Sequence, residues 1–145
     1  MRIEREELQT LVPQKGKMFI VGRIVEAELE SWLIESETEI TENFMFYDGG
    51  AGGAPNYACF EIIAQTVAAL SGLYARKNGL EPSVGFILSV SNLSFDFDTI
   101  KRGEIVRVKA RRETVMESVS SFTAEIYIND KLSGGGKLTA MTASE

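Results

Sequence analysis

Residues 56–77 read NYACFEIIAQTVAALSGLYARK, and this stretch decides the fold. Pro55 stands just before it and Asn78-Gly79 just after it, which are typical start and stop signals of a helix. Apolar side chains occupy almost every turn and leave hardly any polar face. We therefore predict one long helix from Asn56 to Lys77 that is enclosed by other elements.

The sequence on both sides of this helix alternates between apolar and polar residues, as half-buried strands do. Before the helix, a short helix from Arg5 to Val12, ended by Pro13, precedes two strands, Met18 to Glu28 and Trp32 to Thr41. In the second strand, glutamates fill one face. This pattern indicates a sheet with one face in the core.

After the helix the alternation returns. Val84 to Phe97 is strand-like, with a slip near Ser91-Asn92 that suggests a bulge. Residues 106–111 and 122–128 alternate cleanly, and Asn129-Asp130 is a plausible tight turn into a final strand, Lys131 to Thr142. In that strand we expect Leu132, Leu138 and Ala140 on one face.

The order of these elements is strand, strand, helix, strands. It predicts an α+β domain in which an antiparallel sheet of five to seven strands wraps around one central helix, the hot-dog fold. At 145 residues the chain fits a single domain spanning 1–145.

Composition excludes several classes of function. The net charge of −6 argues against nucleic-acid binding. No apolar run appears long enough to cross a bilayer, the charged N-terminus lacks an export signal, and Cys59 stands alone, so we expect a cytoplasmic protein without membrane contact. The chain has no histidine, so we expect no metal and no cofactor.

Glu61 is the first charged residue of the apolar helix, and Gln65 is a polar residue that follows it. Glu61 and Gln65 are four residues apart and therefore lie on one face. Burying either without a partner costs about 2–7 kcal/mol, and more for a charge. The apolar surroundings should raise the pKa of Glu61 and suit it to acid or base catalysis. The alternative is that Glu61 reaches solvent or a dimer contact.

A glycine-rich loop precedes the helix and contains Gly49, Gly50, Gly52 and Gly53. Such a loop lets a ligand approach bare amides beside a helix N-terminus, where a thioester carbonyl that develops negative charge is stabilised. An ordinary flexible loop is the alternative.

Two segments resemble bacterial 3-hydroxyacyl-[acyl-carrier-protein] dehydratases, in particular the branch found in pigment and polyketide-type pathways. The stretch LVPQKGKMFIV at 11–21 is similar to the opening motif Leu-Leu-Pro-His-Arg-x-Pro-(Met/Phe)-Leu-Leu of that family. FEIIAQTVAAL at 60–70 is similar to its helix motif, Ile-Glu-x-Met-Ala-Gln-Ala-x-Ala. Residues 84–88 and 101–104 follow in the right order, so the resemblance spans most of the chain.

The resemblance implies that Glu61 is catalytic. The family's second catalytic group is a loop histidine from the other subunit, and a gap-free alignment puts Tyr47 in its place, while Gln14 replaces the histidine of the opening motif. Tyr47 is a good hydrogen-bond donor, and the neighbouring Asp48 is a candidate base; simple loop packing is the alternative for both. We expect Gln65, Gln14 and the loop glycines to contact substrate.

Three functions fit these residues. The leading hypothesis is a lyase that dehydrates 3-hydroxyacyl thioesters carried by acyl carrier protein or CoA in fatty-acid or polyketide-type synthesis. The alternatives are a thioesterase of the same fold and a non-catalytic subunit that pairs with an active paralogue. We expect a homodimer or higher homo-oligomer, or a heterodimer with a paralogue. A basic patch for an acidic carrier has these candidates: Arg76, Lys77, Lys101, Arg102, Arg107, Lys109, Arg111 and Arg112.

Overall fold

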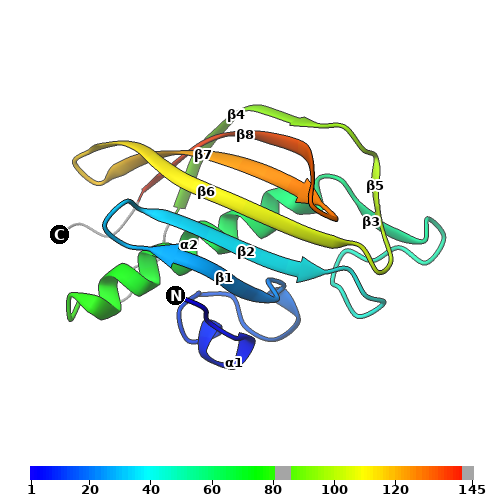
Figure 1. Ribbon diagram of the computed structural model, residues 1–145, viewed down its shortest axis with the longest axis horizontal. Coiled ribbons are helices and arrows are strands. Elements are labelled where there is room, and N and C mark those ends of the chain that lie inside the picture. Colours follow the sequence, from blue (N-terminus) through cyan, green and yellow to red (C-terminus); the bar gives the residue numbers. More distant parts are fainter. Residues whose placement is uncertain (81–85, 142–145) are drawn as a thin grey trace.

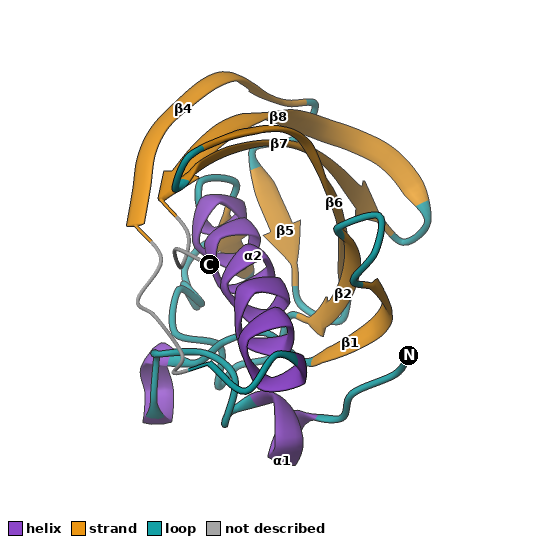
Figure 2. Cartoon of the chain, turned by 90° about the vertical axis from the view of Figure 1, so that its left-hand side faces the viewer, coloured by secondary structure: helices purple, strands orange, loops and turns teal. Residues whose placement is uncertain are grey.

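The computed structural model describes residues 1–80 and 86–141 of the chain. A six-stranded antiparallel sheet in the order β1-β2-β6-β7-β8-β4 curls over one long helix, α2 (Figures 1 and 2). The strands of this sheet are β1 (Arg23–Glu28), β2 (Leu33–Glu39), β4 (Phe86–Phe95), β6 (Ile105–Met116), β7 (Val119–Ile128) and β8 (Lys131–Met141). The predicted hot-dog arrangement is confirmed.

Helix α2 (Ala58–Lys77) is the core of the domain. It begins two residues later than predicted, because Asn56 is held by the chain after β4: its amide nitrogen donates to Asp98 O at 2.9 Å and its side chain to Phe97 O at 2.9 Å. By length and composition this helix is long and apolar enough to cross a membrane, so the expectation that no apolar run reaches that length is wrong. Most of it is buried against the sheet, as in the core helix of a soluble domain.

The inner and outer faces of the sheet follow the predicted alternation. Ile34, Val108 and Ile126 are fully buried toward α2. The outer face carries charges in pairs: Arg107 contacts Glu35 at 3.3 Å and Asp130 at 2.8 Å. The alternation therefore sets which face of each strand enters the core.

The N-terminal segment departs from the prediction. Helix α1 (Arg5–Leu8) stops before Val12, and a 3-10 turn, η1 (Gly16–Met18), replaces the start of the first strand, which begins at Arg23. The chain between η1 and β1 is held by hydrogen bonds from side chains and not by pairing with a neighbouring strand. The Arg5 guanidinium donates to Phe19 O at 2.8 Å and to Val21 O at 2.6 Å, so this segment lies under α2 without joining the sheet.

The last strand is also irregular. A register shift between Ile126 and Tyr127 in the pairing of β7 with β8 places Leu132 on the exposed side, so the prediction that Leu132 shares a face with Leu138 and Ala140 is wrong. The expected bulge in β4 is confirmed by a register shift between Ser91 and Ser94. Val84, Gly85 and Thr142 lie outside the described residues.

A second, two-stranded sheet joins β3 (Gly53–Pro55) to β5 (Thr99–Lys101), which the sequence did not indicate. A Cβ on Gly53 would lie 2.0 Å from Ile100 O, so only glycine permits this pairing. The turn at Asn129 and Asp130 is confirmed, and both residues have positive φ, 48° and 69°.

The two margins of the main sheet differ. At β1, Ile3 forms an isolated antiparallel bridge with Ile24 through backbone hydrogen bonds of 3.0 and 2.9 Å, and so covers part of the edge. At β4, no strand among residues 1–80 and 86–141 pairs with the outer side. Figure 2 shows β4 and β1 at opposite margins of the curved sheet, with α2 between them.

Candidate active site

Glu61 lies in the first turn of α2, where the helix is only partly covered. Its side chain is half-buried, and its Oε2 is buried without a hydrogen-bond partner among the described residues. Desolvation raises the pKa of this carboxyl above its usual value, and the Gln65 amide offsets part of the rise. The predicted rise in the pKa of Glu61 is confirmed. A carboxyl in this state is suited to exchanging a proton with a ligand.

Glu61 belongs to a stripe along α2 that the sheet leaves partly uncovered. We name it the α2 seam and define it as Tyr57, Phe60, Glu61, Ala64 and Ala68, all exposed or half-buried. Tyr57 is 64% exposed and Phe60 39%. Successive helix residues are about 100° apart, so Gln65 lies about 40° to one side of Glu61 and Phe60 about 100° to the other. The carboxyl therefore lies between two differently built walls.

The wall on the Gln65 side is the N-terminal segment. Gln65 is fully buried; its Oε1 accepts from Ile20 N at 3.0 Å and its Nε2 donates to Met18 O at 2.7 Å. The side chain thus fixes residues 18–20 against the helix. Its contact with substrate stays a prediction, and the structure adds a positioning role.

The wall on the Phe60 side is an apolar slit between α2 and the sheet. It is lined by Phe60 and Ile63 of α2, Val90 and Leu93 of β4, Ala124 of β7, and Gly136, Lys137 and Leu138 of β8. Its volume of about 10 Å³ holds about one water molecule. A Cβ on Gly136 would lie 2.8 Å from Leu93 Cα, so the glycine allows β4 to pack this closely.

Tyr47 and Asp48 lie in the loop before β3. The Tyr47 side chain is half-buried against the core. Asp48 is exposed and closes the loop: its Oδ1 accepts from Gly50 N at 2.9 Å, and its backbone oxygen accepts from the amides of Ala51, Gly52 and Gly53. The expectation of bare amides is therefore wrong for Gly50, Gly52 and Gly53. Gly49 is exposed at the tip.

Gln14 is half-buried between α1 and η1, and its Oε1 is buried without a hydrogen-bond partner in the described chain. Across residues 1–80 and 86–141, no hydrogen bond or ion pair joins Glu61 to Tyr47, Asp48 or Gln14. The structure brings Glu61 and Gln65 together on one helix. It leaves the two loop candidates and Gln14 as separate predictions.

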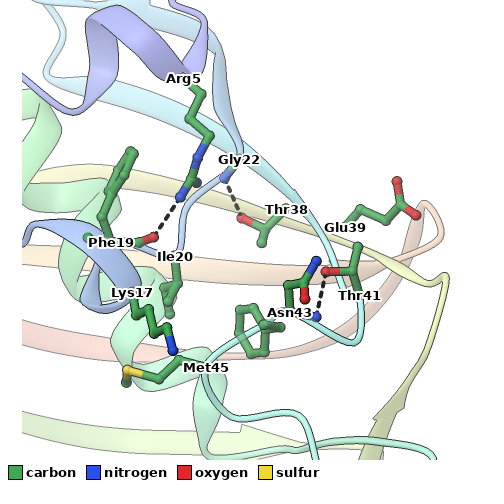
Figure 3. A pocket seen from close by; sticks show the side chains of 12 residues that line it. Arg5, Lys17, Phe19, Ile20, Gly22, Thr38, Glu39, Thr41, Asn43 and Met45 are labelled. Carbon is green, nitrogen blue, oxygen red and sulfur yellow. Dashed lines mark hydrogen bonds between the residues drawn. The ribbon is translucent and has the colours of Figure 1, made fainter.

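Sequence reasoning missed a larger cleft of about 460 Å³ between the N-terminal segment and the loop after β2, which is called the N-terminal cleft below (Figure 3). Its lining includes Lys17 and Ile20 from the first segment and Thr41, Asn43 and Met45 from the second. These residues are 20 or more positions apart and share no periodic pattern. The opening motif at 11–21 is the part of the sequence analysis that touches this region, because Gly16, Lys17, Phe19 and Ile20 line the cleft.

Comparisons with known proteins point to a dehydratase family with the hot-dog fold described above. The sequence model of the family described as "ApeP-like: ApeP dehydratase" matches residues 6–145. The 3-hydroxyacyl-[acyl-carrier-protein] dehydratase FabZ of Chlamydia trachomatis is 20% identical over 137 residues, covering 92% of this chain and 88% of the relative. FabZ of Xanthomonas campestris pv. campestris is 19% identical over 146 residues, covering 99% and 94%.

Solved structures show the same fold. The dehydratase heterocomplex ApeI:P from Xenorhabdus doucetiae superposes with a TM-score of 0.85 at 14% identity, covering 95% of this chain and 91% of that chain. A hypothetical thioesterase protein with coenzyme A from Streptococcus pneumoniae gives a TM-score of 0.63 at 12% identity, covering 84% and 85%. With a family match over nearly all its residues, the chain belongs to the ApeP-like dehydratase family of hot-dog proteins.

Proposed function

We propose that this protein takes part in the dehydration of 3-hydroxyacyl thioesters carried on acyl carrier protein or CoA, with Glu61 as the acid–base group. The observation that carries the proposal is the buried Oε2 of Glu61 in the α2 seam, for which residues 1–80 and 86–141 supply no hydrogen-bond partner. A carboxylate oxygen held without a hydrogen bond is costly to keep, and a substrate hydroxyl supplies the missing donor. Family membership and the FabZ relatives support the same reaction.

The chemistry needs two proton transfers. A base removes a proton from C2 of the acyl chain, the C2–C3 double bond forms as the C3–O bond breaks, and an acid protonates the departing hydroxyl to give water. The raised pKa of Glu61 brings its proton affinity closer to that of the groups it exchanges with. Glu61 is therefore proposed to serve as the acid that protonates the hydroxyl, or as the base at C2.

The apolar slit beside Phe60 supports this substrate class. Its lining is almost wholly hydrocarbon, and it begins at the residue next to Glu61. Phe60 is partly exposed at its margin, so rotation of one side chain widens the slit. A hydrocarbon tail placed there leaves the C2 and C3 atoms near the Glu61 side of the helix.

The second catalytic group is proposed to come from another hot-dog subunit. The α2 seam and the outer edge of β4, which pairs with no strand among the described residues, meet at the slit, where Phe60 of the seam lies beside Val90 and Leu93 of β4. The chain contains no histidine, so in a homodimer the candidates for the second group are Tyr47 and Asp48, whereas in a heterodimer a paralogue would supply it. The heterocomplex architecture of the Xenorhabdus doucetiae relative supports the second arrangement.

A hydrolase remains the competing function because several structural neighbours are described as thioesterases. There Glu61 or Asp48 would activate water against the thioester carbonyl. We place either function in the cytoplasm, where acyl thioester metabolism is located and where the single buried Cys59 stays reduced.

The test is a product assay with matched variants. The protein, alone and mixed with a histidine-bearing paralogue, is given 3-hydroxyacyl thioesters on acyl carrier protein and on CoA, and enoyl product and free thiol are measured. We expect enoyl product to fall at least about 100-fold in Glu61→Gln, the usual scale of a lost acid–base group, and not in Glu30→Gln. No enoyl product under any condition contradicts a dehydratase role, and thiol release dependent on Glu61 indicates the hydrolase.

A further inference from the structure

Four buried polar side chains lie where α2, β2 and the N-terminal segment meet. Ser36 and Thr38 stand on the inner face of β2, in line with the apolar and fully buried Ile34. Gln65 and Thr66 are adjacent on α2. Ser36, Gln65 and Thr66 are fully buried, and Thr38 is 3% exposed. Burying a hydroxyl or an amide is costly, so their presence at one junction needs a physical reason.

Hydrogen bonds of these side chains join each pair of the three parts. Ser36 Oγ and Thr66 Oγ1 are 2.8 Å apart and join β2 to α2. Thr38 Oγ1 accepts from Gly22 N at 3.1 Å and joins β2 to the N-terminal segment. Gln65 joins α2 to the same segment through the two hydrogen bonds described above. The three connections form a closed set, and we name the four side chains the polar triangle.

The hydrogen bond between Ser36 and Thr66 has a definite direction. Thr66 Oγ1 donates to Ile62 O at 2.7 Å, one turn back along α2. A hydroxyl has a single hydrogen, so Thr66 accepts from Ser36, and the three groups form a chain from β2 into the backbone of the helix. This chain ends on the residue that follows Glu61.

Stability alone does not account for the Ser36–Thr66 pair. Two buried hydroxyls that bond each other contribute little net free energy, and replacing both by apolar groups of similar shape is nearly neutral. What the pair adds is geometry, because a hydrogen bond fixes a distance and a direction, whereas apolar surfaces slide past each other. Gln65 and Thr66 project in directions about 100° apart around the helix axis. Together they hold α2 against rotation about its axis.

We infer that Ser36 and Thr66 are positioning residues, which set the rotation of α2 and thereby the direction in which the Glu61 carboxyl enters the α2 seam. The inference rests on the proposed function, since it names what places the acid–base group. A carboxyl roughly 6 Å from the helix axis moves by about 1 Å when the helix turns by about 10°. A misplacement of that size lowers the rate of a positioned reaction by up to about 100-fold.

The test compares variants that lose the two hydroxyls singly and together. Ser36→Ala and Thr66→Val each remove one partner, the double variant removes both, and Thr66→Ser keeps the hydroxyl. Ser71→Ala is the matched control, because it removes another buried hydroxyl of α2, one that lies outside the polar triangle. Enoyl formation is measured in the assembly that is active, and stability is measured by urea unfolding. Carbon-13 NMR follows the titration of the Glu61 carboxyl and needs no substrate.

We expect kcat to fall about 10- to 100-fold in Ser36→Ala, Thr66→Val and the double variant, with KM changed less than about twofold, and to recover in Thr66→Ser. Thr66→Val should lose stability, because the buried Ser36 hydroxyl loses its acceptor, and the double variant should regain most of it. Burial raises the pKa of Glu61, so a displaced carboxyl in the double variant should titrate closer to the usual value of 4.5.

A double variant that regains both stability and kcat overturns the inference, because the pair is then only structural. An unchanged Glu61 titration in the double variant also overturns it, as does a loss of kcat in Ser71→Ala equal to that in Thr66→Val. Where the double variant does not fold, equal kcat and equal Glu61 titration in Thr66→Val and Thr66→Ser overturn it. If no assembly forms enoyl product, the proposed function fails, while the Glu61 titration still decides whether the pair positions the carboxyl.

Discussion

Glu61 is the residue on which the proposed chemistry depends, and its energetics follow from its position on α2. At neutral pH its charged form is partly desolvated and one oxygen has no hydrogen-bond partner among the described residues, so the folded state carries an electrostatic cost. Such a cost is typical of groups that are retained for function. The same cost predicts that replacing Glu61 changes the stability of the protein in a way that depends on pH.

We expect Glu61→Gln to be more stable than the original protein at pH 8, by up to about 1 kcal/mol after allowance for solvent screening. Burial raises the pKa of Glu61 in the folded state. Protonation therefore favours folding: its contribution is complete below the unfolded pKa near 4.5 and is lost as the pH rises through the folded value. The gap between variant and original should close near pH 4. Thermal unfolding from pH 4 to 8 measures it; a gap that is independent of pH contradicts the assignment.

Cys59 is two residues from Glu61 but faces the core. Burial raises the pKa of its thiol to about 12. The native protein at pH 8 should therefore resist alkylation by iodoacetamide and react fully once unfolded in urea. Mass spectrometry of the labelled protein checks this. Labelling of the native protein at the rate of a free thiol would show that the start of α2 opens easily.

At the scale of elements, the decisive feature is how α2 holds the N-terminal segment. Gln65 bonds both Met18 O and Ile20 N, and Gly72 lets the segment approach, since a Cβ there would lie 2.3 Å from Leu11 O. The segment thus runs along the helix from Gly72 to Gln65 and forms one wall of the N-terminal cleft. The helix serves both as the core of the sheet and as the support of the cleft.

Replacing Gln65 with Leu should destabilise the protein by about 1–3 kcal/mol, because it leaves the buried donor Ile20 N and the partly buried acceptor Met18 O without the side chain that pairs them. Urea unfolding measures the loss of stability. Gln9→Leu, at the exposed C-terminal end of α1, is the control. Hydrogen exchange should show lost protection at the Ile20 amide. Full protection at Ile20 in the variant would mean that another group holds the segment.

At the scale of the whole molecule, α2 has one side that the sheet covers and one side that the sheet leaves partly exposed. The sheet wraps α2, while the α2 seam and the β4 edge remain open next to each other. Burying this surface against a second subunit would remove apolar area and pair a free strand edge. The proposed acid–base site would then lie at the junction of two subunits.

A charge placed on the α2 seam should therefore block assembly. Tyr57→Glu puts a carboxylate at a position that is 64% exposed in the isolated chain, so the domain should fold and the dimer should be lost. Light scattering at micromolar concentration, with and without a paralogue, measures the mass. Met116→Glu, 78% exposed at the end of β6, is the control. Equal assembly of both variants would place the interface elsewhere.

Local sequence determined most of the architecture. The apolar run at 56–77 fixed the core helix, and the alternation in β2, β6 and β7 fixed which side chains face it, because burial repeats with the period of the element. Glu61 stood out for the same reason, as a charge inside an apolar helix. The turn at Asn129-Asp130 followed from residues that tolerate positive φ.

Tertiary structure alone decided what surrounds Glu61. Residues 18–22 were predicted as strand from their composition, but Arg5 and Gln65 bond their backbone from 14 to 47 positions away, and no periodic pattern records such contacts. Asp48 closes the loop amides, a bulge turns Leu132 outward, and two distant segments form the N-terminal cleft. Periodicity reports whether a residue is buried; which groups meet depends on long-range packing of the folded chain.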